Sequence, residues 1–148
     1  MPYQSRLGAV LLMRTLKEEE AHREWARARK ILDAQQACLN AFNTTLQTTL
    51  TGLAGLQNGG FVVAQDLTLY FRFIENVREG IKQQEQVVMR EEAVCEGKRA
   101  LLEEAVKARK VIETIEEKRK GAYWDALYKK EQAVLDEISG QLPVRSHG

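Results

Sequence analysis

The sequence is poor both in residues that interrupt helices and in residues that build a thick core. Its 148 residues include only 2 prolines, 4 phenylalanines, 4 tyrosines and 2 tryptophans. Charged residues make up 29% of the chain, and the mean hydropathy is -0.40. This composition is typical of long helices that share a thin apolar seam, and it argues against a compact mixed domain.

The chain also lacks a dominant charge and a long apolar run. Its 22 basic and 21 acidic residues leave a net charge of +1, which gives no general attraction to nucleic acid or anionic lipid. The run from Leu7 to Met13 is far shorter than the roughly 20 residues that span a bilayer, and no signal peptide is visible. We therefore expect a cytoplasmic chain with no nucleic-acid partner and no direct membrane insertion.

The residues that carry most enzyme chemistry are few and scattered. His22 and His147 lie far apart, and neither has a ligand at metal-site spacing. Cys38 and Cys95 form no redox or metal motif, and they are expected to be small buried hydrophobes beside the seam. The sequence has no nucleotide loop and no nucleophile elbow, so we expect no enzyme activity, no cofactor and no metal.

What the chain does have is two heptad patterns. In the first half, two sets of residues recur every seven positions with an offset of three, as in the a/d seam of a coiled coil. The first set is Trp25, Leu32, Leu39, Leu46 and Leu53, and the second is Ala28, Gln35, Phe42, Thr49 and Leu56. In the second half the sets are Leu67, Ile74, Ile81, Val88, Cys95 and Leu102, and Tyr70, Val77, Gln84, Glu91, Lys98, Ala105 and Ile112.

The strongest break between the two patterns is Asn58-Gly59-Gly60. It favours a chain reversal over one continuous helix in a parallel dimer. The sequence therefore predicts an all-α fold, a single-domain antiparallel two-helix coiled-coil hairpin with unequal arms. The expected helices are about 5–56 and 66–139, with Asp66 as N-cap, a turn over 57–65 and a disordered tail over 142–148. Pairing about the turn places Leu39 near Glu79 and Leu11 near Lys107.

This pairing leaves the second expected helix without a partner from about Glu113 onward, although apolar and aromatic residues continue along it. An unpaired apolar helix face needs a cover, either from a partner or from the folded-back N-terminal residues. A second candidate surface is the tip near the turn. There Phe71 and Phe73 cannot both face the opposite helix, so we expect at least one to be exposed.

The end of the second arm resembles the C-terminal signature of the FliJ family of flagellar export proteins, which is related to the YscO-type stalk proteins of type III secretion. The resemblance rests on Glu131-Gln132 followed, after two residues, by Leu135-Asp136-Glu137. The opening of the chain, with Arg6-Leu7 and Leu11-Leu12, and the segment around Tyr70 and Phe73-Ile74 are similar to the same family.

The resemblance implies a coiled-coil stalk that binds the hexameric export ATPase, the large membrane subunit of the export gate and export chaperones. Carried onto this sequence, the gate-binding residues are Phe73, Val77, Gly80 and Gln84, although the family often has an alanine-like residue and a histidine at the last two positions. The ATPase-binding residues are Tyr123, Leu127, Glu131, Gln132, Leu135 and Asp136. A stalk of this kind is expected to be a monomer in isolation and to associate peripherally with the inner-membrane export apparatus.

The leading hypothesis is therefore a non-enzymatic stalk or adaptor of an export ATPase. The alternatives are a generic coiled-coil scaffold, a prefoldin-like helical-hairpin chaperone, and a homologue that serves a secretion system other than the flagellum.

Overall fold

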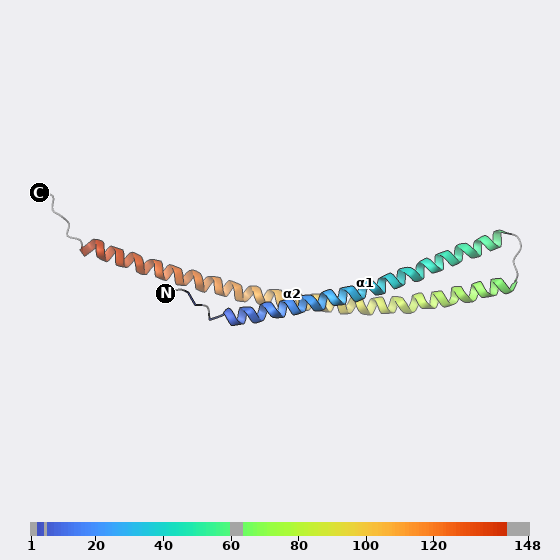
Figure 1. Cartoon of the computed structure of the whole chain (residues 1–148), viewed down its shortest axis with the longest axis horizontal. Helices are drawn as coiled ribbons and strands as arrows, with labels where there is room; N and C mark the ends of the chain where they lie inside the picture. The colour runs from blue at the N-terminus through green and yellow to red at the C-terminus, as the bar shows by residue number, and fades with distance from the viewer. Residues whose placement is uncertain (1–2, 5, 60–63, 142–148) are drawn as a thin grey trace. The chain divides into compact units, whose positions relative to one another are not determined.

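The computed structural model describes residues 3–4, 6–59 and 64–141, and these form two long α-helices with no strand among them. Helix α1 runs from Gly8 to Asn58 over 51 residues, and α2 runs from Ala64 to Gln141 over 78 residues (Figure 1). The predicted fold class, an antiparallel helical hairpin with unequal arms, is confirmed. The expected tail over 142–148 and residues 60–63 of the expected turn lie outside the described residues.

The helix bounds differ from the expected ones by two or three residues. Helix α1 continues through its threonine-rich stretch, where the threonine hydroxyls donate to the carbonyl one turn earlier. Examples are Thr44 to Asn40 at 2.9 Å and Thr49 to Thr45 at 2.7 Å. These bonds keep the helix closed although β-branched residues are weak helix formers. Helix α2 begins before Asp66, which lies in its first turn rather than at the N-cap and there suits the positive end of the helix dipole.

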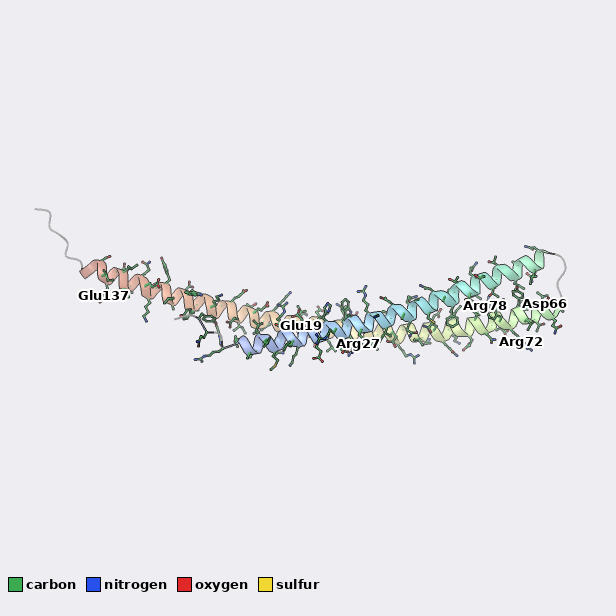
Figure 2. All side chains as sticks on the ribbon, in the orientation of Figure 1. Glu19, Arg27, Asp66, Arg72, Arg78 and Glu137 are labelled. Carbon is green, nitrogen blue, oxygen red and sulfur yellow. The ribbon has the colours of Figure 1, made fainter. Side chains whose placement is uncertain are left out.

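The chain divides into two compact units, which we describe separately. The unit formed by Glu19–Glu103 holds the heptad seam, where α1 and α2 lie side by side in opposite directions (Figure 1). The buried side chains of this seam are Ala28, Leu53, Ile74, Val77 and Val88, all positions of the predicted repeats. Charged side chains such as Arg72 and Arg78 point into solvent (Figure 2). The seam thus follows the heptads, with the exception of Leu56, which is exposed.

The pairing within this unit is one helical turn away from the expected one. Phe42 lies against Gly80, whereas the expected pairing places it opposite Asn76. The ends of the two helices, Asn58 and Ala64, are centred on residue 61, while the sequence-based pairing is centred on residue 59. A shift of two residues in the centre moves every cross-helix pair by four residues, which is about one turn.

The second unit combines Met1–Glu18 with Glu104–Gly148. Its described part is tied together by the Arg109 guanidinium, which donates to Glu18 on α1 and to Glu113 on α2, the latter at 2.6 Å. These hydrogen bonds raise the pKa of Arg109, so the guanidinium stays charged. A charged group therefore joins the two helices at this level.

Replacing a seam residue should cost far more stability than replacing an exposed one on the same helix. Ile74 is 4% exposed and Met89 is 60% exposed. We expect Ile74→Ala to lower the free energy of unfolding by about 2–3 kcal/mol and Met89→Ala to change it by less than about 0.5 kcal/mol. Urea unfolding followed by circular dichroism measures both. Equal losses for the two variants would contradict the assignment of the seam.

Candidate functional site

Within the described residues, the two helices offer surfaces for binding rather than a centre for chemistry. No group of three or more His, Cys, Asp or Glu side chains lies close enough to hold a metal ion in that part of the chain. Likewise, neither described helix is long and apolar enough to cross a membrane. The candidate sites are therefore two apolar surfaces, one in each unit.

The first surface is a shallow apolar groove near the start of α2. It has a volume of about 510 Å³ and is lined by Thr48, Thr49, Gly52, Leu69, Tyr70 and Phe73. The Tyr70 hydroxyl packs beside Gly52, 3.5 Å from the Cβ position of that glycine, which is an ordinary van der Waals distance. Leu69 and Phe73 stand exposed at the edge. The groove is thus an apolar recess large enough to accept a side chain of a partner.

Phe71 lies on a different face of the same helix. Its side chain is 50% exposed and that of Phe73 is 48% exposed, but only Phe73 lines the groove. Both side chains are exposed, so the expectation that at least one would be exposed is confirmed. Phe73 belongs to the groove, whereas Phe71 is an exposed aromatic residue outside it.

Of the four residues expected to bind the export gate, only Phe73 is exposed. Val77 is 6% exposed in the seam. Gln84 is half-buried, and its amide donates to the side-chain oxygen of Gln35 at 2.8 Å and to the Gln35 carbonyl at 2.9 Å. Both residues therefore hold α2 against α1. Val77 and Gln84 therefore do not line the groove at the tip; they hold together the two helices that form it.

Gly80 has an intramolecular role that sequence reasoning missed. A Cβ placed at Gly80 would lie 2.8 Å from Cε1 of Phe42, closer than carbon atoms approach. The glycine therefore forms a notch that the Phe42 ring fills. Phe42 is a position of the predicted heptads, but the expected pairing places it one turn away from Gly80, so the sequence did not indicate their contact.

The second surface is the end of α2, and its first residue is covered from within the chain. The rings of Tyr3 and Tyr123 lie 5.3 Å apart, and Tyr123 also meets Trp124 edge to face at 5.4 Å. Burial and a hydrogen bond to Glu116 raise the pKa of Tyr3. Cover by the N-terminal segment therefore continues to Tyr123, and the uncovered part of α2 begins later than the expected Glu113.

Beyond Tyr123, α2 is exposed along most of its length to Gly140. A second shallow groove, of about 480 Å³, is lined by Leu127, Lys130, Glu131, Val134 and Leu135. Three of the expected ATPase-binding residues, Leu127, Glu131 and Leu135, follow one another at steps of four and share this face.

The other expected residues of this end lie elsewhere on the helix. Gln132 and Asp136 are exposed but do not line the groove, since a step of one residue turns the side chain by about 100°. Glu137, labelled in Figure 2, is exposed near the end of the helix. The structure therefore brings Leu127, Glu131 and Leu135 together and leaves Gln132 and Asp136 beside them.

The two cysteines are free. Cys95, a position of the predicted heptads, is half-buried, and Cys38 is exposed. The expectation of two buried thiols is therefore wrong for Cys38 and only partly met by Cys95. The heptad explains the difference, because Cys38 lies one position before the seam residue Leu39 and is turned away from α2.

Comparison with protein families matches residues 3–148 to the model of the flagellar FliJ protein, which is nearly the whole chain. No curated protein matches the chain, and no solved structure matches it.

The contact between Phe42 and Gly80 can be tested by a double-mutant cycle. Gly80→Ala alone should lower the free energy of unfolding by about 1 kcal/mol, because the clash with Phe42 outweighs the better helix propensity of alanine. In a Phe42→Leu background the same change should be neutral or stabilising, which gives a coupling of about 1–2 kcal/mol. Chemical denaturation of the four proteins measures the cycle. Additive effects would show that the two residues do not touch.

Proposed function

We propose that this chain, which belongs to the flagellar FliJ protein family, is the stalk that joins the export ATPase ring to the export gate. Membership of the family makes it a component of the flagellar export apparatus. The proposal holds that the chain acts by binding and has no enzyme activity of its own. The proposal adds partners to this role: the ATPase hexamer, the large membrane subunit of the gate, and export chaperones. Its place would be at the cytoplasmic face of the inner membrane.

The observation that carries the proposal is the uncovered face of α2 beyond Tyr123. Trp124, Tyr128, Val134, Leu135 and Ile138 are all between 48% and 63% exposed. Aromatic and large aliphatic side chains supply most of the energy of protein interfaces. An uncovered row of them on a helix is favourable only when a partner removes it from water. We assign this face to the ATPase, with Leu127, Glu131 and Leu135 at its centre.

Tyr123, Gln132 and Asp136 complete the proposed ATPase surface at its edges. Tyr123 is already packed against Tyr3, so the N-terminal segment and α2 would meet the ring together. Gln132 and Asp136 are exposed polar groups next to the apolar face. Such groups suit the rim of an interface, where they set orientation more than affinity.

The gate-binding surface is assigned to the tip groove, with Phe73 as the residue that contacts the partner. Val77, Gly80 and Gln84 contribute by holding α2 against α1, since all three engage the opposite helix or the seam. An extended or helical segment of the gate subunit that presents an apolar side chain would fit the recess lined by Leu69 and Phe73.

Binding to the gate should depend on Phe73 and not on Phe71. Phe73→Ala removes a large apolar contact from the groove, so the dissociation constant for the gate subunit should rise at least about tenfold. Phe71→Ala is the matched control, because it is as exposed as Phe73 but lies outside the groove. Isothermal titration calorimetry measures both. Equal weakening, or none, would remove the groove from the proposal.

The ATPase should be stimulated by the chain through the end of α2. Adding the protein to the cognate export ATPase should raise the hydrolysis rate and produce a larger complex by light scattering. Leu127→Asp with Leu135→Asp should abolish both effects, since two charges would be buried without partners.

The control for that experiment is Ile31→Asp, an exposed apolar position on α1 in the other unit. It should leave stimulation unchanged. A folded wild-type protein that neither binds nor stimulates the ATPase would contradict the stalk assignment and favour a coiled-coil scaffold.

A further inference from the structure

The end of α2 changes the sign of its charge along its length. The stretch 118–130 contains five basic residues and one acidic residue, Asp125, whereas the stretch 131–141 contains three acidic residues and no basic one. The chain as a whole is almost neutral, with a net charge of +1. The positive charge of this helix end is therefore concentrated in one stretch of about three and a half turns.

Within this stretch, one half of the helix surface holds aromatic and basic side chains together. Since successive residues turn by about 100°, Asp125 lies on the opposite half of the helix. Trp124 is 48% and Tyr128 is 63% exposed. Glu117 precedes this half-surface along the helix and Glu131 follows it. The half-surface, named here the basic-aromatic face, consists of Arg119, Lys120, Tyr123, Trp124, Tyr128 and Lys130.

At the start of this face, Arg119 shares a polar recess with the N-terminal segment. The recess has a volume of about 320 Å³ and is lined by Tyr3, Gln4, Arg6 and Arg119, which all belong to the same compact unit. Arg109 of that unit is paired with Glu18 and Glu113. In contrast, neither Arg6 nor Arg119 forms an ion pair within the part of the chain that the structure describes. Two guanidinium groups therefore share one recess without a paired carboxylate.

The donors around the recess suit a phosphate group. A guanidinium group binds phosphate through two parallel N–H···O hydrogen bonds, and this recess offers two such groups. The amide of Gln4 adds a further donor. The nearby carboxylate of Glu116 accepts a hydrogen bond from Tyr3, and among the described residues it forms no ion pair with either arginine. The donors of Arg6 and Arg119 are thus available to an anion from outside the chain.

We propose that the recess and the basic-aromatic face together bind an anionic phospholipid surface. A headgroup phosphate occupies the recess between Arg6 and Arg119. The rings of Trp124 and Tyr128 lie at the level of the headgroups, where aromatic side chains with a polar edge are favoured. The exposed lysines of the face are attracted by the negative surface potential. A free phosphate ion would use the recess alone, whereas a lipid surface covers the recess and the aromatic side chains beside it.

Lipid binding goes beyond the proposed stalk function, which requires protein partners only. The basic-aromatic face overlaps the proposed ATPase surface at Tyr123, Trp124 and Tyr128. One molecule would therefore engage either the lipid or the ATPase through this part of α2. The groove at the tip lies in the other unit and shares no residue with the face. Because vesicles can be offered to the chain alone, lipid binding is tested without the ATPase or the gate.

Flotation of the full chain with vesicles tests the proposal. The wild-type protein should bind phosphatidylglycerol vesicles, should not bind phosphatidylcholine vesicles, and should be released by high salt. Arg6→Glu with Arg119→Glu should lower the partition coefficient at least about tenfold, because each basic residue at an anionic surface contributes about fivefold. The matched control is Arg72→Glu with Arg78→Glu, an equal change of charge at exposed positions of the other unit (Figure 2). This control should bind nearly as well as the wild type.

The fluorescence of Trp124 reports the contact directly. The chain has 2 tryptophans, so Trp25→Phe leaves Trp124 as the only one. Its emission should shift to the blue when phosphatidylglycerol vesicles are added, because the ring leaves water, and circular dichroism checks that each variant remains helical. Equal binding to both kinds of vesicle, undiminished binding of the Arg6 and Arg119 variant, or an equal loss in the control would overturn the proposal. Binding of inorganic phosphate without binding of vesicles would overturn it in favour of a site for the free ion.

Discussion

The contact between Phe42 and Gly80 decides which residues of the hairpin are available to a partner. A heptad seam fixes which face of each helix is buried, but it tolerates a slip of one turn because leucine-like residues recur at every level. The notch at Gly80 accepts a ring at only one level, and Gln84 with Gln35 adds a polar pair close to it. With the register set in this way, Val77 is buried and Phe73 stays at the edge of the tip groove.

The seam could be predicted from the sequence because burial and heptad spacing have the same cause. Ile74, Val77 and Val88 are repeat positions, and all three are buried. The register could not be predicted, because a heptad seam allows pairing at more than one level. The expected pairing is centred on residue 59, whereas the helix ends at Asn58 and Ala64 are centred on residue 61, and this difference amounts to one turn.

The sequence predicted where the candidate surfaces lie along the chain, but not all of the contacts that shape them. An apolar row beyond Tyr123 is visible as spacing in the sequence, and its exposure follows from the unequal lengths of the helices. Cover by the folded-back N-terminal residues was one of the two alternatives drawn from the sequence, and the contact of Tyr3 with Tyr123 shows how far along α2 it extends.

Cysteine cross-linking tests the register most directly. In a background with Cys38→Ser and Cys95→Ser, the pair Phe42→Cys with Gly80→Cys should be joined rapidly by a short thiol cross-linker, because these positions face each other. The pair Phe42→Cys with Asn76→Cys, one turn away, should react slowly. Faster cross-linking of the pair at 42 and 76 would contradict the register, and with it the assignment of Phe73 as the exposed residue of the tip.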